Sequence, residues 1–224
     1  MSRPITAPAV GGGTTTGTNR LLILGCNCNS NTGDNSNDYI NYNHITVCPI
    51  TNFGKSKMNS TATTSGGYVG SLMNTQIIGP TATTGSLTGT INEQLYAEFG
   101  SHLKTIREQL SNSISTSASN KRNDNNDLGA SNNWAWTWVQ AVLMGEIEVF
   151  GSSIWSSSPF DVGSAKKQYP AFMYSTEDMI RRDTWYWLKD IVSGTRFSDV
   201  LTYGNVHNHT ADTLIAVKPR FILA

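Results

Sequence analysis

Residues 91–114, INEQLYAEFGSHLKTIREQLSNSI, carry the most regular hydrophobic pattern of this 224-residue chain. The apolar residues recur every three or four positions, at Ile91, Leu95, Phe99, Leu103, Ile106 and Leu110. This spacing puts apolar side chains on one face of an α-helix. Thr90 followed by Glu93 also matches a capping box, a common start of a helix. The pattern therefore predicts a helix over residues 91–114.

A second helix is predicted over residues 134–150, where apolar residues occur on nearly all sides. Gly151 can serve as its C-cap. Trp134 and Trp138 are four positions apart, so we expect both side chains in the core. Glu146, within the same segment, is expected to join a buried polar network.

Short strands are predicted on both sides of the two helices. They cover residues 21–24, 40–50, 171–174, 185–188, 197–201 and 214–223, and turn-forming residues separate most of them. Two helices in mid-chain followed by a run of antiparallel strands are typical of an α+β arrangement.

The N-terminal segment has a different amino-acid composition. Residues 1–20 are dominated by Pro, Gly and Thr, and residues 25–38 form a polar stretch rich in Asn and Gly. We therefore expect residues 1–38 to form an extended arm held by a partner chain, and residues 39–224 to form the compact part. The stretch NKRNDNND, residues 120–127, is expected to be a solvated loop.

Composition excludes several functional classes. Sixteen Lys and Arg residues balance sixteen Asp and Glu residues, which argues against nucleic acid or an anionic membrane as the partner. No apolar run is long enough to span a bilayer, and no secretory signal is visible. Only 14 % of residues are charged, and Ser, Thr and Asn replace them. Such uncharged polar surfaces favour an extracellular or virion protein that is made in the host cytoplasm and released by lysis.

Few residues suggest metal or cofactor chemistry. Cys26, Cys28 and Cys48 could join His44 as a zinc site, but reduced cysteines without a special role are the preferred interpretation. On a strand, His207 and His209 would lie on one side with a spacing that suits a metal. Their surroundings, GNVHNHT at residues 204–210, favour a polar turn instead. We therefore predict no metal and no cofactor.

Several blocks of the sequence resemble the C-type-lectin-like module of bacteriophage tail- and head-fibre proteins. The C-terminal blocks are WYWLKDIVS (185–193), FSDV (197–200), GN (204–205) and VKPRFI (217–222). The upstream blocks are KMN (57–59), GGYVGS (66–71), FGSHL (99–103), REQL (107–110), LMGEIEVFG (143–151) and YPAF (169–172). The resemblance covers about residues 39–224. Lys189 and Lys218 stand where Arg is usual, which puts an internal salt bridge in doubt, and Ala216 replaces a Gly.

The resemblance implies a C-type-lectin-like fold, with two helices on a small twisted antiparallel sheet and with the first and last strands brought together. It implies a phage virion structural protein, whose arm attaches to other virion proteins and whose module recognises a host cell-surface glycan or protein. A homo-oligomer, favoured as a trimer, is expected. Related modules include the enzyme that makes formylglycine, which depends on cysteines. Because all three cysteines here lie at or before residue 48, no enzymatic activity is expected.

In such modules the ligand contacts come from loops near the last strands. The expected ligand-binding residues are Arg196, Asp199, Tyr203, Asn205, His207, Asn208, His209 and Asp212. The alternative is a capsid or tail decoration or cement protein with no receptor-binding role. An enzyme acting on glycans ranks last, because no pair of carboxylates suggests a catalytic cleft.

Overall fold

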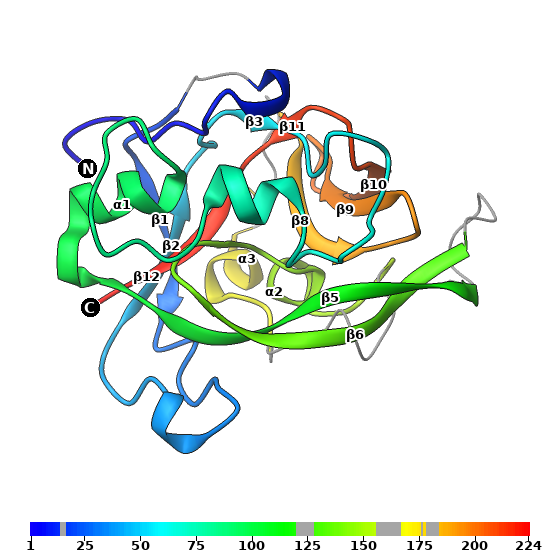
Figure 1. Ribbon diagram of the computed structural model, residues 1–224. Coiled ribbons are helices and arrows are strands. Elements are labelled where there is room, and N and C mark those ends of the chain that lie inside the picture. The colour runs from blue at the N-terminus through cyan, green and yellow to red at the C-terminus, as the bar shows by residue number, and fades with distance from the viewer. Residues whose placement is uncertain (14–16, 120–127, 156–166, 176, 178–183) are drawn as a thin grey trace.

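The computed structural model spans residues 1–224 and describes all of them except residues 14–16, 120–127, 156–166, 176 and 178–183. The described part is a mixed α/β structure built mostly of strands with a few short helices, which is compatible with the α+β class (Figure 1). It contains two five-stranded sheets and a long two-stranded ribbon. The loop 120–127 predicted from the sequence lies outside the described residues.

The first sheet joins the beginning and the end of the chain. Its strands follow the order β1 (Leu21–Cys26), β2 (Ile45–Pro49), β12 (Pro219–Leu223) and β4 (Leu103–Lys104), and β7 (Val142–Leu143) also pairs with β12. All these pairings are antiparallel. The expectation that the first and last strands come together is met, because β1 and β12 flank β2.

The second sheet carries most of the C-terminal blocks. Its order is β10 (Val206–Thr210), β9 (Arg196–Val200), β8 (Tyr186–Ile191), β11 (Ile215–Ala216) and β3 (Lys55–Ser56). The β8–β11 pair is parallel, and the other pairs are antiparallel. The predicted strands 185–188 and 197–201 are confirmed within a few residues. The predicted turn over residues 204–210 is wrong, since most of it forms β10.

The first predicted helix is half right. Helix α1 (Ile91–Phe99) begins at the Thr90–Glu93 capping box, which is confirmed, and ends before Gly100, whose φ of 55° favours glycine. Beyond it the chain forms β4 and then β5 (Ile106–Ser119), so the helix prediction is wrong after Phe99. In β5 the buried residues alternate with half-buried ones, at Ile106, Glu108 and Leu110.

The second predicted helix is wrong over most of its length. Residues 128–139 form β6 (Leu128–Val139), which pairs with β5 in a long ribbon below the body of the molecule (Figure 1). Only α2 (Glu146–Phe150) is helical, and Gly151 is its left-handed C-cap as predicted. Trp134 and Trp138 are 41 % and 47 % exposed rather than in the core, because strand geometry turns both to the outer face of the ribbon.

The remaining helical elements are short. Residues 171–174, predicted as a strand, lie in α3 (Pro170–Tyr174), where the proline occupies the first turn without losing a helical hydrogen bond. The π-helix η3 (Met73–Ile78) buries Met73, Ile77 and Ile78. Three 3-10 turns also occur in the described part of the chain: η1 (Val10–Gly12), η2 (Ser36–Asp38) and η4 (Gly100–His102). Among the described residues, no helix is long and apolar enough to cross a membrane.

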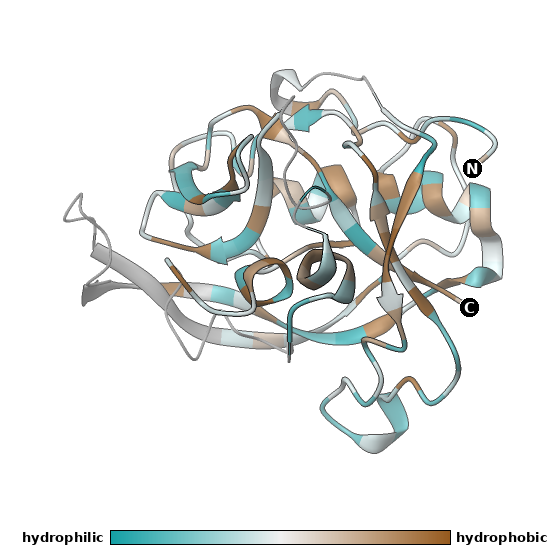
Figure 2. Ribbon diagram, turned by 180° about the vertical axis from the view of Figure 1, so that it is seen from behind, coloured by the Kyte–Doolittle hydropathy of each residue, from teal (hydrophilic) through white to brown (hydrophobic). Residues whose placement is uncertain are grey.

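Two apolar clusters form the core. The larger one packs residues of α1, η3, β5 and β12 together, and the smaller one packs α2 and α3 against β1 and β8. Figure 2 shows the matching hydrophobic colour on the central strands and helices. The second sheet therefore has apolar packing on both faces, which holds its strands in place.

The described part of residues 1–20 packs against its own chain, in contrast to the expected extended arm held by a partner chain. Ile5 and Ala7 are buried in the larger cluster. The Ile5 N–H donates to the Thr18 carbonyl at 3.1 Å, and the Ala7 N–H donates to the Phe53 carbonyl at 2.5 Å. Gln94 on α1 closes the contact, donating to the Thr6 carbonyl at 2.6 Å.

A buried ionic network ties α2 to the sheets. The Glu148 carboxylate accepts from Lys189 Nζ at 2.8 Å, from the Tyr169 hydroxyl at 2.7 Å and from Arg220 at 3.3 Å, and Arg220 also pairs with Glu108. Lys189 therefore makes an internal salt bridge, which the comparison with the resembling modules had put in doubt. Although burial opposes its charge, Glu148 and Asp190 raise the pKa of Lys189. Burial lowers the pKa of Arg220 to about 9, which leaves it cationic at neutral pH.

Candidate ligand-recognition site

The hairpin of β9 and β10 brings together three of the residues singled out from the sequence. In its register Asp199 lies directly opposite His207. Opposite residues of antiparallel strands share a face, and so do residues two apart on one strand. Asp199, His207 and His209 therefore lie on one face of the second sheet, which we call the histidine face.

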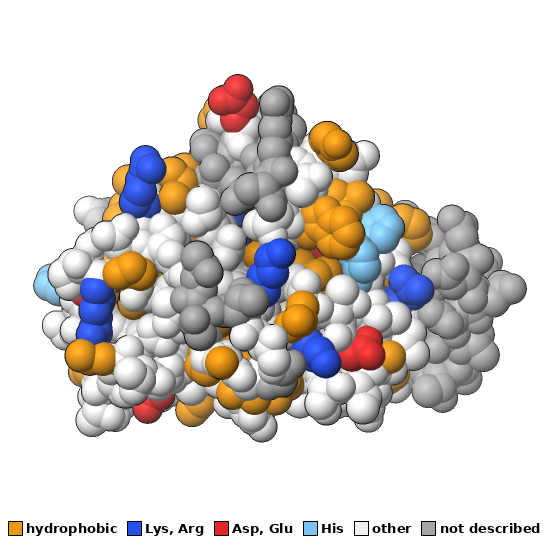
Figure 3. Space-filling view, turned by 90° about the horizontal axis from the view of Figure 1, so that it is seen from above, with side chains coloured by type: hydrophobic (Ala, Val, Ile, Leu, Met, Phe, Trp, Pro, Cys, Tyr) orange, Lys and Arg blue, Asp and Glu red, His pale blue; other side chains and the backbone are white. Residues whose placement is uncertain are grey.

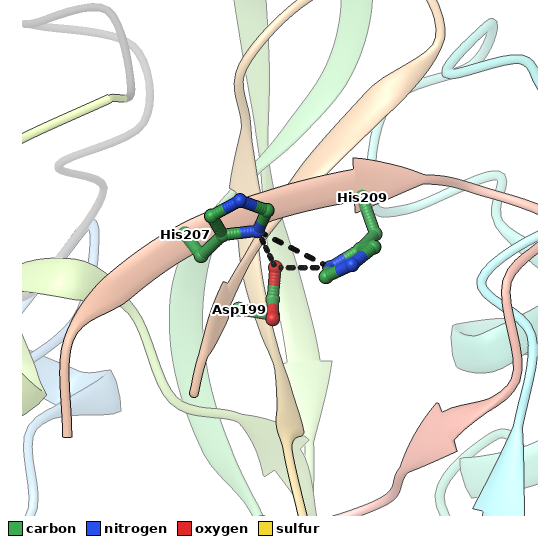
Figure 4. A group of neighbouring side chains, drawn as sticks. All are labelled: Asp199, His207 and His209. Carbon is green, nitrogen blue, oxygen red and sulfur yellow. Dashed lines mark hydrogen bonds and ion pairs between the residues drawn. The ribbon is translucent and has the colours of Figure 1, made fainter. Parts of the chain in front are cut away.

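The side chains of these three residues converge (Figure 4). The Nδ1 atom of His209 lies 2.9 Å from Asp199 Oδ1, and the Nδ1 atom of His207 lies 3.7 Å from the same oxygen. The two Nδ1 atoms are 3.4 Å apart. Asp199 is fully buried, whereas the side chains of His207 and His209 are 44 % and 20 % exposed. The arrangement is a buried carboxylate covered by two imidazoles that solvent reaches.

Trp185 extends this surface, although it is not among the binding residues predicted from the sequence. Its indole stacks on the His209 ring with 4.8 Å between ring centroids and 21° between ring planes. It also lines a shallow pocket of about 230 Å³ together with Lys55, Thr184, Thr202, Leu214 and Ile215. The view from above shows histidine side chains next to hydrophobic ones (Figure 3). The signal in the sequence was the alternation Trp185–Trp187, which places both indoles on one side of a strand.

The other predicted residues occupy different positions. Tyr203 and Asn205 are exposed in the turn between β9 and β10. Arg196 and Asn208 lie on the opposite face of the hairpin, where Arg196 Nη1 donates to Asn208 Oδ1 at 3.2 Å. Asp212 follows β10 in a turn. The eight predicted residues thus do not form one patch. Five lie at the tip or on the histidine face, Arg196 and Asn208 lie on the opposite face, and Asp212 lies in a separate turn.

The base of the hairpin is held by buried polar contacts. Ser198 Oγ donates to Glu146 Oε1 at 2.6 Å, and Glu146 Oε2 accepts the backbone N–H groups of Ile154 and Trp155 at 2.6 and 3.0 Å. The prediction of a buried polar network at Glu146 is confirmed. Because β9 is fixed to α2 in this way, the residues at the tip project from a rigid support.

The same three residues are the candidates for a metal. Among the described residues, Asp199, His207 and His209 form the one group of three or more His, Cys, Asp or Glu side chains whose ligand atoms lie close enough for an ion. Cys26, Cys28, Cys48 and His44 form no such group. Cys48 is buried, Cys26 is exposed, and the His44 ring accepts from the Asn29 N–H at 3.2 Å.

A second hollow lies away from the hairpin. A pocket of about 350 Å³ is bordered by Trp138 and Thr137 of β6, by Asn92 of α1 and by the chain around Pro80. The Arg107 guanidinium lies 5.3 Å from the centre of the Trp138 ring. Sequence reasoning missed this surface because it assigned Trp138 to the core.

Comparisons of the chain with protein-family models, with curated proteins and with solved structures find no match. The resemblance to phage lectin-like modules therefore rests on the sequence blocks alone.

Proposed function

We propose that this chain is a structural protein of a bacteriophage particle, of the tail- or head-fibre type, and that a lectin-like module in it recognises the host surface. The recognition site is the tip of the β9–β10 hairpin with the histidine face and Trp185. Its role is binding, with no catalytic step, and the ligand is a glycan or a protein of the host surface.

One observation carries this proposal: exposed aromatic and amide side chains lie on and beside a hairpin that buried polar contacts hold in place. Tyr203 is 78 % exposed, and Trp185 and Asn205 are exposed as well. Aromatic rings give a large contact area at a low cost in conformational entropy, and amides add adaptable hydrogen bonds. Such a surface suits an uncharged ligand such as a glycan.

Contact with other virion proteins needs a surface other than the first residues of the chain, because Ile5 and Ala7 are buried. Residues 27–43, which include η2, form a loop that projects below the body (Figure 1). Asp34 ties this loop to β5 by accepting two hydrogen bonds from Arg107, at 2.9 and 3.1 Å. We assign the contact with the particle to this loop, and we keep the expectation of a homo-oligomer, favoured as a trimer.

The test is binding of the full-length chain to host cells and to a glycan array. The variants Tyr203→Ala and Trp185→Ala should each weaken binding at least about 10-fold, as loss of an aromatic anchor does. Tyr174→Ala is the matched control, because Tyr174 is 86 % exposed but lies on α3. Equal binding by Tyr203→Ala, Trp185→Ala and the wild type would show that the hairpin is not the recognition site.

The alternative, a decoration or cement protein, is favoured by the exposed Trp134 and Trp138 on the β5–β6 ribbon. Large exposed apolar side chains that lie close together often mark a protein–protein contact. For this alternative, Trp138→Ala should reduce incorporation into particles while host binding by the isolated chain is absent. Cell binding that depends on Tyr203 contradicts it.

A further inference from the structure

We propose that Asp199, His207 and His209 bind one divalent transition-metal ion of the zinc type. This site goes beyond the proposed recognition function and does not depend on it. Two imidazole nitrogens and one carboxylate oxygen are a ligand set that zinc accepts, and three protein ligands leave a fourth position open.

The spacing of the three ligand atoms fits the ion. Zinc lies about 2.0–2.2 Å from nitrogen and oxygen ligands, so in a tetrahedral site the ligand atoms lie about 3.4 Å apart. Here Asp199 Oδ1 lies 2.9 Å from His209 Nδ1 and 3.7 Å from His207 Nδ1, and the two Nδ1 atoms are 3.4 Å apart. An ion can therefore enter with small rotations of the side chains and no movement of the strands.

The charge of Asp199 is an independent reason to expect a cation at this site. The side chain is fully buried, and its Oδ2 atom has no hydrogen-bond partner among the described residues. No Lys or Arg of the described chain forms an ion pair with it. A buried carboxylate needs a compensating positive charge, and breaking such compensation is strongly unfavourable. A divalent cation held by the two histidines supplies that charge.

The surroundings hold the ligands and leave the ion accessible. The ladder pairing of β9 and β10 fixes Asp199 opposite His207, and the stacked Trp185 indole restrains the His209 ring. The exposed edge of His207 leaves an approach for water or for a ligand oxygen at the fourth position. The site is built on strands, so its geometry is set by the sheet rather than by a loop.

The first experiment is titration of the full-length chain, stripped with a chelator, with Zn²⁺ in a calorimeter. Co²⁺ is then used as a probe, because its visible absorption reports tetrahedral coordination. We expect one ion per chain, an absorption band typical of nitrogen and oxygen ligands, and a thermal unfolding midpoint that rises with Zn²⁺ concentration. Absence of one-to-one binding in the wild type overturns the proposal.

Variants locate the ion. His207→Ala should weaken Zn²⁺ binding at least about 100-fold, since even loss of a residue behind the ligands costs 10- to 100-fold. This variant should fold, because His207 is half-exposed. Asp199→Asn keeps an oxygen to accept from His209 but removes the charge, so it should also lose the ion. If either variant binds Zn²⁺ like the wild type, the three residues form only a hydrogen-bonded cluster.

Two controls exclude other metal-binding groups. His102→Ala removes an exposed histidine outside the site, and the double variant Cys26→Ser, Cys28→Ser removes the accessible thiols. Both should keep the affinity and the one-to-one ratio of the wild type. Loss of the ion in the cysteine variant would place the metal at the thiols and contradict the proposed site.

Discussion

The Glu148 carboxylate accepts hydrogen bonds from three buried side chains, and one of them, Tyr169, provides a pH-dependent test. Burial of the phenol, reinforced by the neighbouring Glu148 carboxylate, raises the pKa of Tyr169 well above its ordinary value. The folded state therefore keeps this proton at a pH where the unfolded chain releases it. Above about pH 10 the unfolded state binds fewer protons, so this group lowers stability as the pH rises.

Tyr169→Phe removes both the hydrogen bond and this titration. At pH 8 the variant should be less stable than the wild type by about 1–3 kcal/mol, the cost of leaving part of Glu148 unpaired. Above pH 10 the wild type should lose stability faster, and the difference should shrink by up to about 1.4 kcal/mol per pH unit. Urea unfolding between pH 8 and 11 measures this. Tyr174→Phe is the exposed control, and a difference independent of pH contradicts the assignment.

At the candidate site, His207 and His209 were predicted from the sequence, but the strand that carries them and their neighbours were not. The spacing of His207 and His209 suggested one face of a strand, yet the surrounding Gly and Asn residues favoured a turn. The β10 strand forms because it pairs with β9, which is a tertiary effect that local composition does not contain. Trp185 joins the site through its stack on His209, a contact between residues 24 positions apart.

At the scale of elements, there is a physical reason why the residues of the β5–β6 ribbon were predicted to be helical. The residues Ile106, Glu108 and Leu110 form the inward face of β5, but a glutamate at an inward position hides the alternation. Its charge is compensated by Arg220, which lies 112 positions away in the sequence. No local pattern can reveal that partner. The start of α1 and the C-cap of α2 were predicted correctly, because those signals are local.

The turn that contains Gly66 and Gly67 offers a test of how the ribbon is positioned. Both glycines have positive φ, 82° and 65°. A Cβ on Gly67 would collide with the backbone carbonyl of Ser111 in β5, whereas one on Gly66 would meet only Gly70 Cα, at 3.5 Å. The same loop docks on β5 through the Val69 N–H, which donates to the Ser111 carbonyl at 2.9 Å.

We therefore expect Gly66→Ala to cost about 1 kcal/mol, the penalty for a left-handed backbone. Gly67→Ala should cost on the order of 3 kcal/mol, because the steric clash with the β5 backbone is added. Guanidinium unfolding of the two variants measures the comparison. Equal losses would mean that the loop and β5 are not in close contact.

At the scale of the whole molecule, the first residues belong to the core. Ile5→Ala should lower the free energy of unfolding by about 2–5 kcal/mol, as expected for a buried isoleucine. Ile23→Ala is the matched control, because Ile23 is 56 % exposed on β1, and its cost should stay within about 0.5 kcal/mol. Chemical unfolding of both variants measures this. A free N-terminal arm would make the two variants equally stable.

The α+β class was predicted from the sequence and is compatible with the structure, although most of the two predicted helices form strands instead. The meeting of the first and last strands was implied by the resemblance alone. The packing of the described part of residues 1–20 against the core could not be predicted, because a Pro-, Gly- and Thr-rich segment has few apolar residues that would indicate it. Ile5 is a single side chain, and the apolar cluster that contains it also includes Phe53 and residues of α1 and β12. Burial of isolated residues of this kind depends on the complete fold.

Both ends of the polypeptide lie at the side of the molecule away from the β9–β10 hairpin, as both ribbon views show (Figures 1 and 2). A carrier, bead or fluorescent tag joined at either end is thereby directed away from the tip that carries Tyr203. Immobilisation through a terminus would thus leave the hairpin exposed, and many copies tethered in that orientation would present their hairpins on the same side.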